Sequence, residues 1–372
     1  MPRAAAPTPE DLRLLERARV LGRAGWGRVH PNPVVGCVLV KEGRIVGEGY
    51  HAEFGGPHAE VVALQAAGER ARGATAYVSL EPCDHHGKTP PCSRALVAAG
   101  VERVVFGAAD PGHVSGGGAE TLREAGVQVV GPVWDVRVAR AENPAFFHAA
   151  AAQGPFVALK MALTLDGKVA RRRGERTAIT GEQSQAEVHR LRSGFDAILV
   201  GAGTARVDDP LLTARSDPPP RVPPRRMILD SRGSLPPDAA LFNAEGGGEV
   251  HVFTGPEAAQ GDLERLEGAG AHVHPVPGAG HHLDLNRVLA VAADLGIRSV
   301  LCEGGPTLAA SLLREDRVHR VYLFFAPLTL GENGLPAFGS RAEELTWEAF
   351  RPVEGPATFG RDTLIVLDRE TD

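Results

Sequence analysis

His58, Cys83 and Cys92 lie within one short stretch of the chain, and all three side chain types are ligands that zinc prefers. Zinc that is held by three protein ligands keeps a fourth position for water, which is the arrangement of catalytic rather than structural sites. The pKa of a water in that position falls from about 16 to about 7. Glu60 stands two residues after the histidine, where a carboxylate that is not a ligand can carry protons. The stretch therefore predicts a catalytic zinc site with Glu60 as its acid–base group.

The order and spacing of these residues separate this interpretation from simpler ones. An H-x-E triplet by itself is common by chance, and two cysteines by themselves are also compatible with buried thiols or a disulfide. Together, on either side of a strand-like run, the residues match the H-x-E and P-C signature of zinc-dependent nucleobase deaminases. The second cysteine follows the first after the eight residues DHHGKTPP instead of the usual two. Extended loops of this kind often carry function.

The composition excludes several classes of protein. The 372 residues suit two domains, and the ordinary hydrophobic content of 43% indicates a globular protein. The net charge of −6 leaves no basic excess, so we expect no nucleic-acid partner. Four cysteines are too few for a disulfide scaffold, and Cys37 and Cys302 lie in apolar runs that predict buried thiols. Without a signal-like start or an apolar run of about eighteen residues, we expect a cytoplasmic protein that makes no membrane contact.

The order of the expected elements indicates an α/β protein with two domains. In the first half, strands and helices alternate so that His58 begins a helix, Cys83 follows a strand and Cys92 begins the next helix, which predicts a three-layer α/β/α domain. The second half repeats the alternation and predicts a mostly parallel sheet with antiparallel strands at its C-terminal edge. Its helices are expected near residues 182–193, 257–268, 284–295 and 306–314. We place the domains at residues 1–148 and 149–372.

Long motifs in both halves allow a more specific identification. The first half contains HPNPVVG at 30–36, GEGYH at 47–51, HAE at 58–60 and EPCDHHGKTPPC at 81–92. The second half contains KMALTLDGKVA at 160–170, VGAGTARVDDPLLTAR at 200–215, ILDS at 228–231 and EGGPTLAASLL at 303–313. Over nearly the whole chain, these motifs resemble the bifunctional deaminase–reductase family of riboflavin biosynthesis, the RibD type. The resemblance implies a cytidine-deaminase-like first domain and a dihydrofolate-reductase-like second domain.

The resemblance also implies two consecutive reactions. The first is the zinc-dependent hydrolytic deamination of 2,5-diamino-6-(5-phosphoribosylamino)pyrimidin-4(3H)-one. The second is the NADPH-dependent reduction of 5-amino-6-(5-phosphoribosylamino)uracil to the ribityl compound. The ligands are then small phosphorylated pyrimidines, with one zinc ion per chain and NADPH as cofactors. A homo-oligomer, either dimer or tetramer, is the expected assembly.

In the first domain, the resemblance assigns substrate contacts to four residues. Asn32 and His51 are expected to orient the pyrimidine, Lys88 to hold the 5′-phosphate, and Asp110 to contact the substrate. The family pattern D-P-N-P reads D-P-G-H here, so the contact of the missing asparagine is lost or moves to His113.

In the second domain, two turns after strands, GAGT at 201–204 and EGGPT at 303–307, allow a pyrophosphate to approach the backbone, although neither is a G-x-G-x-x-G fingerprint. The resemblance assigns the substrate to Arg192, Leu212, Arg215 and Glu303, and guanidinium groups match phosphate geometry. Arg176 and Ala178 replace a serine and a tryptophan that are frequent in the family. The expected nicotinamide nucleotide contacts are Ala162, Thr204, Asp208, Ser231, Gly305, Pro306, Thr307, Leu308, Ala309, Ala310 and Ser311.

Three other functions remain open at this point. One is a tRNA- or nucleoside-directed zinc deaminase with a non-catalytic C-terminal domain, against which the loop insertion, the acidic net charge and the EGGPTL segment count. The second is a deaminase whose C-terminal half serves only in oligomerisation, which tight NADPH binding to residues 151–372 would exclude. The third is a zinc-stabilised regulatory protein that binds nucleotide without turnover. Glu60 counts against it, because a structural zinc site has a fourth ligand and needs no proton carrier.

Overall fold

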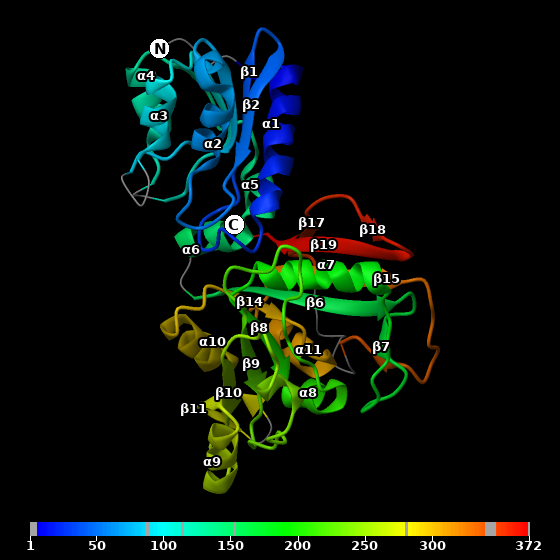
Figure 1. Ribbon diagram of the computed structural model, residues 1–372. Coiled ribbons are helices and arrows are strands. Elements are labelled where there is room, and N and C mark those ends of the chain that lie inside the picture. Colours follow the sequence, from blue (N-terminus) through cyan, green and yellow to red (C-terminus); the bar gives the residue numbers. More distant parts are fainter. Residues whose placement is uncertain are drawn as a thin grey trace. The chain divides into compact units, whose positions relative to one another are not determined.

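The computed structural model describes residues 6–85, 90–112, 115–151, 154–279, 282–338 and 347–370. The chain forms two compact units, residues 1–152 and 153–372, and each has its own sheet and core (Figure 1). Within the described stretches, no helix combines the length and the apolar character that crossing a membrane requires.

The first unit contains, in its described residues, a five-stranded sheet with the order β2-β1-β3-β4-β5. β1 is antiparallel to both of its neighbours, whereas β3, β4 and β5 are parallel to one another. The strands are β1 (Gly36–Lys41), β2 (Arg44–Tyr50), β3 (Thr75–Leu80), β4 (Arg103–Ala108) and β5 (Gln128–Val130). The helices are α1 (Pro9–Gly22), α2 (Ala59–Ala67), α3 (Cys92–Ala98), α4 (Gly118–Glu124), α5 (Val136–Glu142) and α6 (Pro144–Ala151).

Alternating side chains divide this sheet between two cores. Along β1, Cys37 and Leu39 face one core, and Val38 and Val40 face the other, as the two-residue period of a strand requires. Helices α2, α3 and α4 cover the first face and α1 covers the second (Figure 1). The predicted three-layer α/β/α arrangement is therefore confirmed.

Two glycines of β2 allow α2 to pack directly against the sheet. A Cβ atom at Gly47 would lie 2.3 Å from the carbonyl oxygen of Ala63, and one at Gly49 would lie 2.6 Å from the Ala63 nitrogen. Neither approach is sterically possible, so only glycine permits this packing. The contact fixes the position of α2, whose first turn carries the residues of the predicted zinc site.

The second unit contains, where described, a ten-stranded sheet with the order β11-β10-β9-β8-β14-β6-β15-β19-β17, in which β18 also pairs with β19. Its principal strands are β6 (Phe156–Thr164), β8 (Ala197–Gly201), β9 (Arg225–Leu229), β10 (Val250–Thr254), β11 (Ala271–Pro275), β14 (Ser299–Cys302), β15 (Arg320–Ala326), β17 (Phe350–Pro352), β18 (Ala357–Phe359) and β19 (Asp362–Arg369). Shorter strands are β7 (Lys168–Ala170), β12 (Gly278–Ala279), β13 (His282–Leu283) and β16 (Leu335–Pro336). The helices are α7 (Glu182–Ser193), α8 (Ala202–Asp208), α9 (Gln260–Gly268), α10 (Leu285–Asp294) and α11 (Pro306–Arg314).

The pairing in this sheet confirms the second half of the fold prediction. Neighbouring strands from β11 to β15 are parallel, and β19 is antiparallel to β15, β17 and β18. The direction in which successive strands are added to the sheet reverses between β8 and β14. β9, β10 and β11 follow β8 on one side of it, and the next strand of this sheet along the chain, β14, lies on the other side of β8. Open α/β sheets bind their ligands in the crevice at such a reversal.

Three histidines stack at the β10–β11 edge of this sheet. The rings of His272 and His274 lie 5.1 Å and 5.2 Å from that of His251, and His251 Nδ1 lies 3.0 Å from His274 Nε2. Burial, followed by the charges of His274 and His272, lowers the pKa of His251 to about 4. Folding therefore disfavours the protonated ring. The folded state is therefore most stable, as far as His251 is concerned, above the unfolded pKa of about 6.5. This stability is lost progressively as the pH falls toward about 4.

We expect the β10–β11 edge to lose about 2 kcal/mol of stability through His251 between about pH 7.5 and about pH 5. His251→Phe keeps an aromatic ring in the stack but cannot be protonated, so the variant should lose less. Hydrogen exchange of the β10 and β11 amides, corrected for the pH dependence of intrinsic exchange, measures the loss in both proteins. An equal loss in the two proteins would contradict the role of His251.

Candidate active sites

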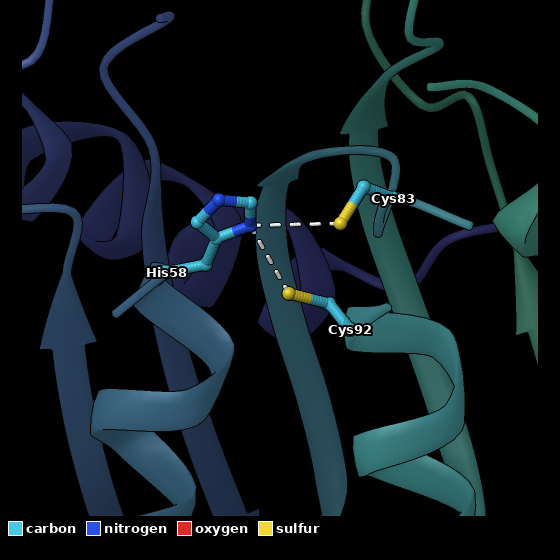
Figure 2. Close-up of side chains that lie close together, drawn as sticks. All are labelled: His58, Cys83 and Cys92. Atoms are coloured by element: carbon cyan, nitrogen blue, oxygen red, sulfur yellow. Dashed lines mark hydrogen bonds between the residues drawn. The ribbon is translucent and has the colours of Figure 1, made fainter. Parts of the chain in front are cut away.

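His58, Cys83 and Cys92 come together although they lie on three different elements. His58 precedes α2, Cys83 follows β3, and Cys92 is the first residue of α3. Figure 2 shows that they point toward one another: His58 Nδ1 lies 3.5 Å from Cys83 Sγ and 3.4 Å from Cys92 Sγ. Their ligand atoms all lie within 4.8 Å of one another, and the described residues form no second cluster of this kind.

Hydrogen bonds tie the loop that carries Cys83 to helices α3 and α4. The Ser93 backbone N–H donates to the Cys83 carbonyl oxygen at 3.2 Å. The carboxylate of Asp84 accepts from Ser93 Oγ at 2.5 Å and from Thr121 Oγ1 at 2.8 Å. These contacts hold Cys83 in place beside Cys92.

The two cysteines differ in their affinity for protons. A hydrogen bond from Cys92, assisted by His58 and opposed by burial, lowers the pKa of Cys83 to about 4. The same bond to Cys83, together with burial, raises the pKa of Cys92. The lowered pKa favours the thiolate form of Cys83, which is the form of cysteine that binds metals.

Glu60 lies in the first turn of α2 with only 3% of its surface exposed. Burial, and next the charge of Cys83, raise the pKa of Glu60 to about 7. A carboxyl group with this pKa can both accept and release a proton at neutral pH, which is the optimum for general acid–base catalysis.

His58, Cys83 and Glu60 line one cavity of about 500 Å³, whereas Cys92 is fully buried and is not part of its described lining. The substrate residues expected from the sequence, Asn32, His51 and Asp110, line this cavity together with His58, Glu60 and Cys83. Its other walls include Pro33, Val35, Phe54, Leu80, Glu81, His85, Ser115 and Phe146.

The hydrogen bonds of His51 determine which of its nitrogens carries the proton. His51 Nδ1 lies 3.0 Å from the carbonyl oxygen of Pro57, so Nδ1 is the donor. Burial lowers the pKa of His51, so the ring is neutral and Nε2 accepts from Asn32 Nδ2 at 3.3 Å. The amide of Asn32 is thereby oriented, and its Oδ1 is left as a hydrogen-bond acceptor.

Asp110 is held at the cavity wall by a neighbouring carboxylate that the sequence did not reveal as a site residue. Glu81 accepts from the backbone N–H groups of Asp110 at 3.3 Å and Ala119 at 3.0 Å. Burial raises the pKa of Asp110. Lys88 and His113, two further expectations, lie outside the described residues.

A second cavity, of about 1250 Å³, lies in the second unit at the ends of β8, β9 and β14. Most of the expected nucleotide contacts line it: Ala162, Thr204, Asp208, Ser231, Gly305, Pro306, Thr307, Leu308 and Ser311. The Gly305 backbone N–H donates to Thr204 Oγ1 at 3.1 Å, which joins the two glycine-containing turns. Ala309 and Ala310 are instead buried in packing, with exposed fractions of 0% and 3%.

Three of the four expected substrate positions of this unit, Arg192, Leu212 and Glu303, line the same cavity. Arg192 forms a two-pronged pair with Glu303, with nitrogen–oxygen distances of 2.6 Å and 3.0 Å. Burial opposes the charge on Glu303, but Arg192 outweighs it and lowers the pKa of this carboxyl group. Lys160 also lines the cavity, and burial lowers its pKa.

Arg215, the fourth substrate position, does not belong to the described lining of this cavity and contacts His189 instead. Arg215 Nη2 lies 2.9 Å from His189 Nε2, and Arg215 Nη1 donates to Thr213 Oγ1 at 2.7 Å. Burial, and then the charges of Arg192 and Arg215, lower the pKa of His189 to about 4. Nothing in the sequence indicated His189 as a site residue beyond its spacing from Arg192 on α7.

The two departures from the family pattern also lie at this cavity. Arg176 and Ala178 are both part of its lining. Burial raises the pKa of Asp208, and the charge of Arg176 partly offsets this rise. Arg176 therefore brings a cation to the cavity where the family frequently has a neutral side chain.

Comparisons with known proteins show which families the two halves of the chain match. Residues 9–108 match the family described as cytidine and deoxycytidylate deaminase zinc-binding region, and residues 155–351 match the family described as RibD C-terminal domain. The chain is similar to the riboflavin biosynthesis protein RibD of Actinobacillus pleuropneumoniae, with 37% identity over 98% of this chain and 97% of the relative. It is also similar to RibD of Aquifex aeolicus, with 41% identity over 87% of this chain and 88% of the relative.

Solved structures extend this similarity to the fold. A diaminohydroxyphosphoribosylaminopyrimidine deaminase/5-amino-6-(5-phosphoribosylamino)uracil reductase from Thermotoga maritima superimposes with a TM-score of 0.79 at 35% identity, covering 97% of this chain and 99% of that chain. RibD from Acinetobacter baumannii gives a TM-score of 0.78 at 33% identity over the same shares. The expected fold, a cytidine-deaminase-like unit followed by a dihydrofolate-reductase-like unit, is confirmed.

Proposed function

This chain belongs to the RibD family of riboflavin biosynthesis proteins and is a bifunctional deaminase and reductase, and from that premise we propose that each of its two units catalyses one of the two reactions. The first unit deaminates 2,5-diamino-6-(5-phosphoribosylamino)pyrimidin-4(3H)-one. The second unit reduces the resulting 5-amino-6-(5-phosphoribosylamino)uracil with NADPH. The observation that carries the proposal is the convergence of His58, Cys83 and Cys92, of which His58 and Cys83 line one cavity together with buried Glu60.

The three converging side chains fit one zinc ion. Zn–N and Zn–S bonds of about 2.0 Å and 2.3 Å in a tetrahedral site place nitrogen and sulfur ligands about 3.5 Å apart. His58 Nδ1 lies 3.5 Å and 3.4 Å from the two sulfur atoms. His58, Cys83 and Cys92 would hold the ion with three ligands, and zinc bound there would make a water molecule acidic enough to attack at neutral pH.

Glu60 carries the protons of the deamination. As water adds to C2 of the pyrimidine, a carboxylate oxygen of Glu60 accepts its proton and delivers it to the ring nitrogen. Glu60 then takes the remaining hydroxyl proton and gives it to the departing amino group, so that ammonia leaves and the C2 carbonyl forms. The pKa of about 7 suits both directions of transfer.

Asn32 and His51 orient the pyrimidine. Because Asn32 Nδ2 is engaged with His51, its Oδ1 is the atom that accepts from the N–H groups of the substrate. Because the His51 ring is neutral, it adds no positive charge beside the zinc ligands. Lys88 is proposed to hold the 5′-phosphate, on the strength of the resemblance alone.

The second cavity suits the nicotinamide nucleotide and the ribosyl group. The first residues of α8, with Gly201 before them, and the turn at Glu303–Gly305 receive the pyrophosphate at the reversal of strand order. NADPH, when bound, supplies the hydride. The Arg192–Glu303 pair presents a fixed carboxylate toward the substrate, and the arginines around His189 suit its phosphate. We further propose a homo-oligomer, dimer or tetramer.

The cofactor preference tests the reductase assignment. With the deaminated pyrimidine as substrate, kcat/KM should be at least about tenfold higher with NADPH than with NADH, because one charged hydrogen bond to the 2′-phosphate contributes roughly 1.5–3 kcal/mol. Arg206 and Arg172 at the cavity are candidate partners. Nicotinamide fluorescence should give the same order of dissociation constants without substrate. Equal values of kcat/KM and of Kd for the two cofactors would refute the preference.

A further inference from the structure

The helical elbow between α5 and α6 contributes to the first cavity, although neither family match includes it. The deaminase match ends at residue 108 and the reductase match begins at residue 155. We propose that Asn143, at this elbow, is a positioning residue for deamination, which holds the loop at residues 30–36 in place so that Asn32 can orient the substrate. The inference rests on the proposed deaminase reaction and adds a residue to it.

The side chain of Asn143 pairs with both backbone groups of a single buried residue. Its Oδ1 accepts from the Val34 N–H at 2.7 Å, and its Nδ2 donates to the Val34 carbonyl oxygen at 3.1 Å. Val34 is 6% exposed, so few water molecules could replace these bonds. Loss of the amide would leave a buried donor and a buried acceptor without partners, and the loop would shift to satisfy them.

A shift of Val34 would also displace residues that line the cavity, because these lie within two residues of Val34 in the chain. The next residue, Val35, lines the cavity, and its carbonyl oxygen accepts from the His51 backbone N–H at 3.0 Å. Asn32 lies two residues before Val34, and its side chain donates to the His51 ring. Asn32 and His51 therefore keep their mutual orientation only while the loop that Asn143 holds keeps its position.

The elbow itself is anchored, which is what a positioning role requires. The carboxylate of Glu142 accepts from Arg19 Nη1 and from Arg23 Nη2, each at 2.6 Å. The side chains of Glu142 and Arg19 are only 10% and 14% exposed, so the ion pair between them is largely shielded from solvent. Phe146, one turn into α6, lines the same cavity. The elbow thus completes one wall of the deaminase site as well as holding its substrate loop.

Asn143→Ala should raise KM for the diamino substrate by about tenfold, with a much smaller change in kcat, because it weakens substrate binding rather than proton transfer. The matched control is Asp135→Ala. Asp135 caps the other end of α5 by accepting from the Arg137 N–H at 2.8 Å, so its loss weakens the same helix without touching the loop. KM should stay at the wild-type value in this control. Zinc content and NADPH oxidation with the deaminated substrate should be unchanged in both variants.

A double-mutant cycle shows whether Asn143 acts through Asn32. If it does, Asn143→Ala should raise KM far less in an Asn32→Ala background than in the wild type. Asn143→Asp keeps the acceptor for the Val34 N–H but places a carboxylate oxygen against the Val34 carbonyl oxygen. This variant should also raise KM, and it provides the test if the alanine variant does not fold. A wild-type KM in Asn143→Ala, or additive effects in the cycle, would overturn the inference. A wild-type protein that releases no ammonia would overturn the deaminase assignment itself.

Discussion

Glu60→Gln should lower the rate of ammonia release from the diamino substrate by about 10²–10⁴-fold, with the higher value expected because the same carboxyl group serves several proton transfers. Glutamine has nearly the shape of glutamate but cannot exchange protons, so the cavity should stay intact. Zinc should remain bound, since Glu60 is not part of the ligand cluster. Ammonia release and zinc content, measured on the same preparation, give both results.

The second reaction provides the internal control for this variant. The reductase cavity lies in the other compact unit and has its own lining, so Glu60→Gln should oxidise NADPH with the deaminated pyrimidine at nearly the wild-type rate. Arg215→Ala should do the reverse and release ammonia normally while it oxidises NADPH more slowly. Loss of both reactions in folded Glu60→Gln protein would contradict the assignment of separate sites.

Cys83→Ser and Cys92→Ser should each lose most of their zinc and nearly all deaminase activity. A serine hydroxyl is a much poorer ligand for zinc than a thiolate, and two remaining ligands cannot hold the ion as three do. Metal analysis after dialysis measures the loss. The wild-type protein should hold one zinc ion per chain.

Cys302→Ala is the matched control for these variants. Cys302 is fully buried in the second unit and is not part of the ligand cluster, so its replacement should leave the zinc content unchanged. Full zinc retention in both Cys83→Ser and Cys92→Ser would contradict the ligand assignment.

The sequence predicted those features that depend on local patterns. The start of α1 shows such a pattern: Thr8 and Asp11 have the spacing of a capping box, the Asp11 N–H donates to Thr8 Oγ1, and the helix begins at Pro9. The alternation of strands and helices predicted both sheets, and Cys37 and Cys302 are buried as their apolar neighbours indicated. The helix that His58 was expected to begin starts at Ala59 and ends at Ala67, because Gly68 has a φ of +57° and a 3₁₀ turn follows.

The parts that the sequence did not predict depend on contacts between distant residues. Nothing near Asn143 indicates that its amide pairs with Val34, because that contact joins residues 109 positions apart. His189 on α7 contacts Thr213 and Arg215, which follow it by more than twenty residues, so its surroundings become clear only in the folded chain. The region of GAGT was expected to be a turn, whereas α8 begins immediately within it at Ala202.

The measurement that tests the central proposal most directly follows ammonia and NADPH together, with the purified protein and the diamino substrate. Without NADPH, the protein should release ammonia and accumulate the deaminated pyrimidine. With NADPH, oxidation should begin after a lag, as that intermediate forms, and should approach one NADPH per ammonia. NADPH oxidation that precedes ammonia release, or ammonia release that is never followed by oxidation, would contradict the proposed pair of consecutive reactions.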